Sequence, residues 1–338
     1  MALLAARTDK GTRKPTNEDA CCIEVAETRF GEVAMAIVCD GVGGLARGEL
    51  ASSTVVERFA TWFEEELPML VEGMADTGAF QFSTVRAVWG ALLSGLNELV
   101  QAYGTSVGAN LGSTFTGIIA CQGRYLVAHI GDCRLYQVGP RQFRQVTEDQ
   151  TLLAKKLASG ELRPEDAASF AQKNVILQSV GTERVLRPSF YEGTFAPDDL
   201  FVILCDGAYR RIGGEGVRRN FQGIDYASER AMGEACERVI RESLEQGEQD
   251  NLTVVCFSGD LIQVAPDSNA VWEPLPQYQE ADTAISQAID AAAAEAEDGE
   301  LLTAVFDDEP EEDPEEPTAV WGVDSEDTPT MVDGGGEA

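Results

Sequence analysis

The stretch VAMAIVCDGVGG, residues 33–44, is an apolar run that ends in an aspartate followed by a glycine-rich turn. Its first six residues are all apolar rather than alternating with polar ones, which is typical of a short strand buried on both faces. Such a strand places the Asp40 carboxylate at the edge of a sheet, and Gly41 allows the backbone to turn away. The stretch therefore predicts a layered protein with an acidic side chain at a sheet edge.

The glycine-rich turn after Asp40 does not match either common nucleotide-binding loop. Glu49-Leu50 stands where a Walker-type phosphate loop requires Lys followed by Ser or Thr, and Ala46 occupies the third glycine position of a dinucleotide fingerprint. The remaining alternatives are a tight strand-to-helix turn and a turn that ligates a metal. The carboxylate of Asp40 favours the metal-ligating turn.

Several other acidic residues have a similar local context, namely Glu18, Asp19, Asp132, Asp206 and Asp250. Taken singly, each fits a solvated turn, a strand exit or a helix cap. Carboxylates at several strand ends converge only if the strands lie side by side, and converging carboxylates repel one another unless cations hold them. Hard divalent ions with oxygen ligands, Mg²⁺ or Mn²⁺, suit such a site.

Cationic and nucleophilic residues limit the kinds of reaction that the site could carry out. Arg13 and Lys14 precede the Glu18-Asp19 pair by a few residues, so they are candidates for a phosphate clamp beside a metal. His129 is the only histidine and lies in a β-prone run, which favours a packed strand residue over a catalytic one.

The predicted elements come mainly as strand hairpins, with helices between the groups of strands. Strands are expected over residues 33–38, 113–121, 124–130, 135–138, 142–146, 200–205 and 252–257, with another in the opening segment before Asp9-Lys10-Gly11. Helices are expected over 48–67 (closed by Pro68), 83–103 (capped by Ser83), 147–168 (broken by Gly160 and Pro164) and 226–245. This order favours an α+β class with antiparallel sheets and helices outside them.

The charge is unevenly distributed along the 338 residues. The formal net charge is −33, and 21 of the 58 acidic residues but none of the 25 basic ones follow residue 268. We therefore expect a domain over residues 1–262 and an acidic, disordered tail over 263–338. This charge balance argues against nucleic-acid binding. A solubilising tail and a tail that docks a basic partner both remain open.

The cysteines and the apolar runs indicate in which cellular compartment the protein is expected. None of the eight cysteines has CxxC spacing, and most lie in apolar strand-like runs, so buried reduced thiols and a cytoplasmic location are expected. The opening Met1-Ala2-Leu3-Leu4 segment is too short for a signal peptide. No apolar run approaches the length of a membrane span, and no membrane association is expected.

Six motifs in order resemble the metal-dependent serine/threonine protein phosphatases of the PP2C type, the bacterial branch in particular. They are Gly11-x-x-Lys14-x-x-Asn17-Glu18-Asp19-Ala20, Asp40-Gly41-Val42-Gly43-Gly44, Gly112-Ser113-Thr114, Gly131-Asp132-Cys133-Arg134, Cys205-Asp206-Gly207 and Asp250-Asn251-x-Thr253. Each motif is weak alone, but six in the family's order over residues 1–258 are a strong signal.

The resemblance implies a four-layer αββα sandwich of two antiparallel sheets flanked by helices, with a two-metal centre for Mn²⁺ or Mg²⁺ at one rim. By matched position, direct or bridging ligands would be Asp19, Asp40, Asp206 and Asp250. The Gly41 carbonyl would complete one metal, and Glu18 would act through a water. Asp132 and Asp206 match a third, weaker site of bacterial members, and residues 150–195 match a variable flap that influences substrate choice.

The resemblance also implies hydrolysis of phosphoserine and phosphothreonine by direct attack of a metal-bridging water, with Asp40, Asp206 and Asp250 carrying the catalytic centre. Lys14 stands where the family usually has Arg, and Arg13 is one place away. Cys133 and Cys205 replace common serines. The alternative function is a phosphoprotein-binding or scaffold module that kept the fold but lost most of its catalysis.

The implied partners are phosphorylated proteins and a cognate serine/threonine kinase. The tail contains three loosely similar stretches, Thr303-Ala304-Val305-Phe306, Thr318-Ala319-Val320-Trp321 and Thr330-Met331-Val332-Asp333. Aromatic residues in a polar tail are candidate anchors, so we hypothesise that the tail docks a kinase or a phosphopeptide-binding domain.

Overall fold

The computed structural model describes residues 2–42, 47–258 and 273–274. Its first sheet has the strand order β1-β10-β9-β6-β7, with bounds Leu4–Asp9, Leu252–Ser258, Leu200–Leu204, Arg134–Gly139 and Gln142–Gln145. The second sheet has the order β11-β2-β3-β4-β5-β8, with bounds Glu273–Pro274, Asp19–Thr28, Gly31–Asp40, Phe115–Cys121, Arg124–Ile130 and Ser189–Thr194. All of these strand pairs are antiparallel, as the hairpin pattern predicted.

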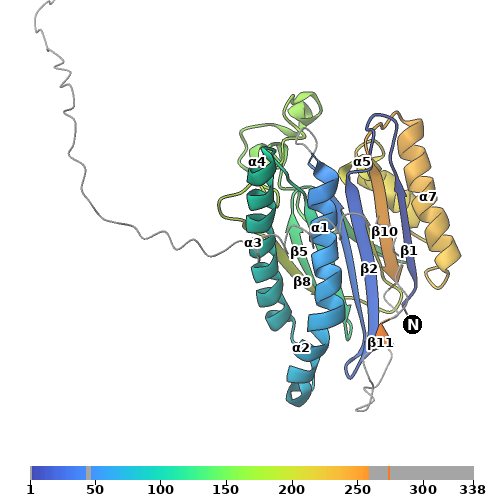
Figure 1. Cartoon of the computed structure of the whole chain (residues 1–338). Coiled ribbons are helices and arrows are strands. Elements are labelled where there is room, and N and C mark those ends of the chain that lie inside the picture. Colours follow the sequence, from blue (N-terminus) through green and yellow to red (C-terminus); the bar gives the residue numbers. More distant parts are fainter. Residues whose placement is uncertain (1, 43–46, 259–272, 275–338) are drawn as a thin grey trace, which may run out of the picture. The chain divides into compact units, whose positions relative to one another are not determined.

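Helices cover the outer faces of both sheets (Figure 1). Helices α1 (Gly48–Thr61), α2 (Leu67–Gly73) and α3 (Phe82–Val107) lie on the side of the second sheet. Helices α5 (Asp206–Tyr209), α6 (Gly213–Phe221) and α7 (Glu229–Glu245) lie on the side of the first, and a short α4 (Leu152–Ala158) stands between β7 and β8 in the chain. The predicted αββα sandwich is confirmed.

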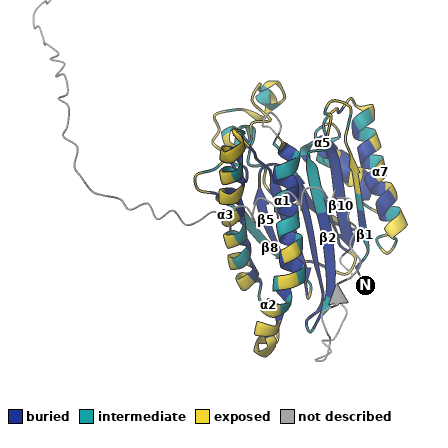
Figure 2. Ribbon diagram, in the orientation of Figure 1, coloured by how far each residue is buried: buried dark blue, intermediate teal, exposed yellow. Residues whose placement is uncertain are grey.

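Strand β3 explains why its sequence is a continuous apolar run. Val33, Met35 and Ile37 belong to the core between the second sheet and helices α1 and α3. Ala34 and Ala36 belong to the core shared with the first sheet. Side chains alternate between the two faces of a strand, so both faces of β3 are buried, and Figure 2 shows most residues of the central strands as buried.

Three sequence predictions about helices were wrong. Pro68 does not close the first helix. A π-helical turn over Trp62–Glu66 leads into α2, and Pro68 lies in the first turn of α2, where a proline is tolerated. Ser83 does not cap α3, which begins at Phe82 after Gln81. The helix expected from Thr147 begins at Leu152, where the Thr151 side chain accepts the Ala154 amide.

Three strands were not predicted, namely β2, β8 and the two-residue β11. None of the helices in the described part of the chain combines the length and apolar character needed to span a bilayer.

The chain divides into units over Met1–Ile285 and Ser286–Ala338, and the second unit lies outside the described residues. The predicted tail over 263–338 also lies outside them, apart from Glu273–Pro274, which pair with Glu27 and Ala26 of β2.

Candidate metal centre

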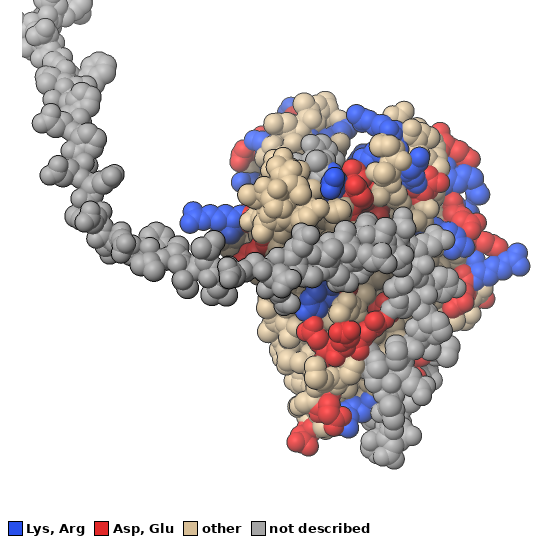
Figure 3. All heavy atoms as spheres, viewed as in Figure 1, with Lys and Arg blue, Asp and Glu red and all other residues tan. Residues whose placement is uncertain are grey.

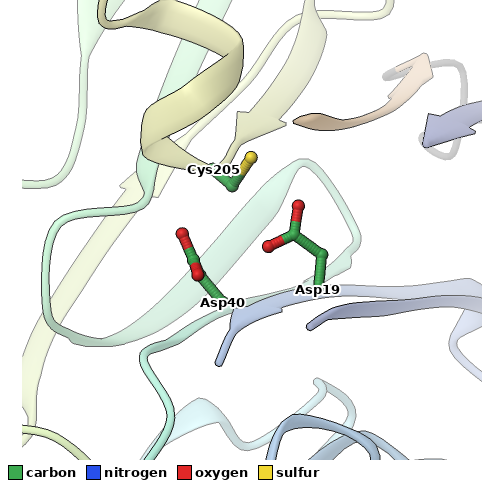
Figure 4. A group of neighbouring side chains, drawn as sticks. All are labelled: Asp19, Asp40 and Cys205. Carbon is green, nitrogen blue, oxygen red and sulfur yellow. The ribbon is translucent and has the colours of Figure 1, made fainter. Parts of the chain in front are cut away.

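The site is built on a pair of aspartates from neighbouring strands. Asp19 is the first residue of β2 and Asp40 is the last residue of β3, and the two stand opposite each other in the antiparallel register. Cys205 comes from the other sheet, directly after β9. Ligand atoms of these three residues lie within 4.8 Å of one another (Figure 4). Strand ends of both sheets therefore meet at one edge, as the acidic motifs predicted.

The backbone around Asp40 is fixed by close packing. The Asp40 amide donates to Thr114 Oγ1 at 2.8 Å, and the Gly41 amide donates to the Glu18 carbonyl at 2.9 Å. A Cβ atom on Gly41 would lie 2.6 Å from the Gly48 carbonyl group and 2.7 Å from the Glu18 carbonyl oxygen. Only glycine therefore fits at this turn, and the glycine holds Glu18 and Asp40 close together.

A chain of hydrogen bonds orients the Asp19 carboxylate. Thr253 Oγ1 donates to Asp19 Oδ2 at 2.7 Å, so the Thr8 hydroxyl must donate to Thr253, 2.9 Å away. Asn17 Nδ2 in turn donates to Thr8 Oγ1 at 2.7 Å. The other oxygen, Asp19 Oδ1, is buried and accepts no hydrogen bond from the described residues. A buried carboxylate oxygen without a donor is suited to a cation.

Electrostatics at the pair are unfavourable without a cation. Burial raises the pKa of Asp19 to about 6. Burial and the neighbouring Asp19 charge raise the pKa of Asp40 well above its ordinary value. Neither aspartate forms an ion pair with a described residue. Carboxylate oxygens with excess negative charge fit Mg²⁺ or Mn²⁺.

Lys14 contacts two of the predicted ligands. Its Nζ atom is 2.5 Å from Glu18 Oε2 and 3.0 Å from Asp250 Oδ1. Burial alone would lower the pKa of Lys14, but its hydrogen bonds to Glu18 and Asp250 raise it overall. Burial alone would raise the pKa of Asp250, but Lys14 lowers it. Arg13 is exposed, and its amide donates to the Gln249 carbonyl at 3.0 Å.

Asp206 is the first residue of α5 and contacts the guanidinium of Arg210, one helical turn later. The Arg210 Nη1 atom lies 3.4 Å from Glu248 Oε1 and 3.7 Å from Asp250 Oδ2. Within the described part of the chain, neither Asp206 nor Asp250 joins the compact group formed by Asp19 and Asp40 with Cys205. The carboxylates of Asp206 and Asp250 thus lie beside the guanidinium of Arg210, outside the compact group.

Asp132 is buried in the loop between β5 and β6. Its carbonyl oxygen accepts the Tyr209 hydroxyl at 2.8 Å, and burial together with the charge of Asp149 raises the pKa of its carboxyl to about 6. Asp132 does not join the compact group either. Its role in a third metal site stays a prediction.

His129 packs within the sheet, as expected from its sequence. Its Nε2 atom lies 3.1 Å from the Glu148 carbonyl, which can only accept, so Nε2 carries the proton. Its Nδ1 atom then accepts from Thr116 Oγ1 at 2.8 Å. Burial lowers the pKa of His129 to about 4, so the ring is neutral near pH 7.

Three supporting residues were not predicted from the sequence. Thr253 orients Asp19, and the Asn251 side chain accepts the Glu18 amide at 2.9 Å while donating to the Lys10 carbonyl at 2.8 Å. Both belong to the Asp250-Asn251-x-Thr253 motif, which was the available signal. Arg210 had no signal, because its position beside Glu248 and Asp250 depends on the tertiary fold.

Comparisons with known proteins show the family of this chain. The family model described as Protein phosphatase 2C matches residues 10–253. A serine/threonine phosphatase, stp, of Listeria monocytogenes is 27% identical over 265 residues, covering 78% of this chain and 98% of the relative. The protein phosphatase PhpP of Streptococcus pneumoniae is 26% identical over 253 residues, covering 74% and 95%.

Solved structures show the same fold. The serine/threonine phosphatase Stp1 from Staphylococcus aureus aligns with a TM-score of 0.66 at 22% identity, covering 76% of this chain and 95% of that one. The catalytic domain of PstP in complex with two manganese ions aligns with a TM-score of 0.58 at 23% identity, covering 76% and 99%. Since the family model matches well over half of the sequence, the chain belongs to the protein phosphatase 2C family.

Proposed function

We propose that this chain is a metal-dependent phosphatase that hydrolyses phosphoserine and phosphothreonine in proteins. The observation that carries the proposal is the half-buried Asp19–Asp40 pair, in which the buried Oδ1 atom of Asp19 lacks any donor among the described residues. Direct or bridging ligands to Mn²⁺ or Mg²⁺ would be Asp19, Asp40, Asp206 and Asp250, with the Gly41 carbonyl, and with Glu18 through a water. Two such ions lower the pKa of water and offset phosphate charge.

The protein's own residues hold this arrangement in place. Thr253 fixes the orientation of Asp19, and Asn251 ties the loop bearing Asp250 to the loop bearing Glu18. Lys14 already lies between Glu18 and Asp250, so it is the cation best placed to bind a substrate phosphate at this edge. Arg13 is exposed one residue away and would contribute a longer-range attraction.

The substrate class rests on the relatives. The similar proteins of Listeria and Streptococcus are named as serine/threonine or protein phosphatases, and this chain covers nearly their whole length. Phosphorylated proteins are therefore the proposed substrates. In Figure 3, basic and acidic side chains are interspersed on the visible face of the described residues, which does not suit a nucleic-acid backbone.

Hydrolysis of a phosphothreonine peptide tests the proposal. We expect phosphate release with Mn²⁺, none with EDTA, and a loss of at least a hundredfold in Asp250→Asn. The matched control is Asp198→Asn, which removes an exposed carboxylate that precedes β9, whereas Asp206 follows the other end of that strand. Tight phosphopeptide binding without hydrolysis by the metal-loaded wild type would instead favour the binding-module alternative.

The remaining partners are proposed on the sequence alone. A cognate serine/threonine kinase would supply the phosphorylated substrates, and the tail would dock such a partner through its three similar stretches, which lie outside the described residues. Pull-down with the full chain and with residues 1–262 tests the docking, since equal recovery would exclude it. A cytoplasmic location is proposed because all eight cysteines are free thiols.

A further inference from the structure

Arg210 occupies an unusual place beside the proposed metal centre. It follows the last residue of α5, and its guanidinium faces three carboxylates, those of Asp206, Glu248 and Asp250. About a quarter of its side chain is exposed, at 26%, and only 4% of the Glu248 side chain is. This partly buried guanidinium links the start of α5, which carries Asp206, to the loop that carries Asp250.

Glu248 makes this link rigid. Its Oε1 atom accepts the backbone amides of Gln249 and Asp250, at 2.9 and 3.2 Å, as well as facing Arg210. The start of α5 and the loop that carries Asp250 are in close contact, because a Cβ on Gly207 would lie 2.1 Å from the Asn251 carbonyl oxygen. Arg210 therefore sits at a fixed point between Asp206 and Asp250 and does not need to move to reach either.

The cations divide the site into two halves. In one half, Asp19 and Asp40 form no ion pair with a described residue and lie together in the compact group. In the other half, Lys14 contacts Glu18 and Asp250, while Arg210 contacts Asp206 and Asp250. The first half offers carboxylates with no built-in cation, and the second offers carboxylates that are already paired.

We propose that Arg210 is an internal counter-cation that competes with a divalent metal for Asp206 and Asp250. A guanidinium keeps its charge at all accessible pH values, so it can yield these carboxylates only by moving away. A divalent ion bound between them would also be repelled by a guanidinium at contact distance. One ion therefore binds first at Asp19 and Asp40, and a second binds only when Arg210 is released.

This inference rests on the proposed metal centre, and a binding measurement tests it without any assay of catalysis. The full chain, stripped with EDTA and dialysed, is titrated with Mn²⁺ by calorimetry, and free Mn²⁺ is followed by electron paramagnetic resonance. We expect two binding steps in the wild type. In Arg210→Gln the weaker step becomes at least tenfold tighter, while the melting temperature of the metal-free protein falls.

Arg211→Gln is the matched control, because Arg211 lies next in the chain, is about half exposed and contacts Glu248 at 3.4 Å. Its Mn²⁺ affinities should stay within twofold of the wild type. Arg210→Lys keeps the charge but loses the fork that spans three carboxylates, so its weaker step should tighten by a smaller factor. Arg210→Lys also tests the proposal if the Arg210→Gln protein does not fold without metal.

Two results would overturn the proposal. If the weaker Mn²⁺ step is unchanged or weaker in a folded Arg210→Gln or Arg210→Lys protein, Arg210 supports the metal ligands and does not compete with metal. If the wild type binds no Mn²⁺, or if Asp40→Asn binds it as the wild type does, the metal centre itself is wrong and the role of Arg210 is refuted with it. The titrations of the wild type and of Asp40→Asn distinguish the second failure from the first.

Discussion

Asp19, the first residue of β2, stands opposite Asp40, the last residue of the antiparallel strand β3, and neither aspartate forms an ion pair with a described residue. Burial and their proximity raise both pKa values. The antiparallel pairing of β2 and β3 thus places two negative charges at the same edge of the sheet. This arrangement costs stability in the absence of metal and favours metal binding.

Removing one charge of this pair should raise the stability of the metal-free protein and abolish its stabilisation by Mn²⁺. In EDTA at pH 8, we expect Asp40→Asn to be more stable than the wild type by about 1 kcal/mol or more, because one buried carboxylate no longer ionises. Its melting temperature should no longer rise with Mn²⁺, because bound ligand stabilises only a protein that binds it. Thermal melts with and without Mn²⁺ check both effects. An unchanged Mn²⁺ response in Asp40→Asn would contradict the site.

Thr253→Val should weaken the site without removing a ligand. The substitution keeps the shape but deletes the hydroxyl that donates to Asp19 Oδ2 at 2.7 Å. Loss of such an orienting hydrogen bond costs roughly 10- to 100-fold in metal affinity or activity. Mn²⁺ titration and peptide hydrolysis measure the loss. Thr105→Val, on an exposed turn of α3, is the control, and equal effects of the two variants would remove the orienting role of Thr253.

Gly41→Ala should disturb the turn that joins Glu18 to Asp40. The added Cβ would lie 2.6 Å from the backbone of Gly48, and such overpacking costs about 1–3 kcal/mol. Gly73→Ala is the matched control, because nothing lies within 4 Å of a Cβ at Gly73, the exposed last residue of α2. There the change should be neutral or stabilise by up to about 1 kcal/mol. Urea unfolding compares the pair, and the account fails here if both variants match the wild type.

His129 should make the protein sensitive to mild acid. Its pKa is about 4 in the folded protein, below the ordinary value of 6.5, because burial disfavours the charged ring. Between these pH values the unfolded chain binds the extra proton, so stability falls as the pH drops from 6.5 towards 4. The loss should reach about 3 kcal/mol relative to His129→Gln. Unfolding free energies of both proteins across this range, taken as a difference, test it, and parallel curves would contradict it.

The hairpins and the acidic motifs were visible in the sequence because both are local. The continuous run of β3 and the Gln122-Gly123 turn, where both residues have positive φ, gave the antiparallel pairing. Strand β2 was not predicted because polar residues interrupt its pattern. One of them, Glu24, is buried, and burial together with the nearby Glu64 charge raises its pKa to about 7.

The acidic residues could be assigned to one sheet edge, but their grouping could not. Asp19 begins a strand instead of ending one, and it meets Asp40 only because β2 and β3 are antiparallel. Arg210 and Glu248 lie 38 positions apart, and their contact depends on how α5 packs beside the start of β10. The sequence therefore predicted which residues supply charge, and the fold decided which carboxylates have a cation beside them.

The most direct test of the metal centre is anomalous diffraction at the manganese absorption edge from crystals grown with Mn²⁺. We expect two peaks about 4 Å apart at the edge where β2 begins and β3 and β9 end, in contact with Asp19, Asp40, Asp206 and Asp250. Arg210 should then have moved away from Asp206. No peak at this edge in metal-saturated crystals, or peaks bound only elsewhere on the protein, would contradict the central claim.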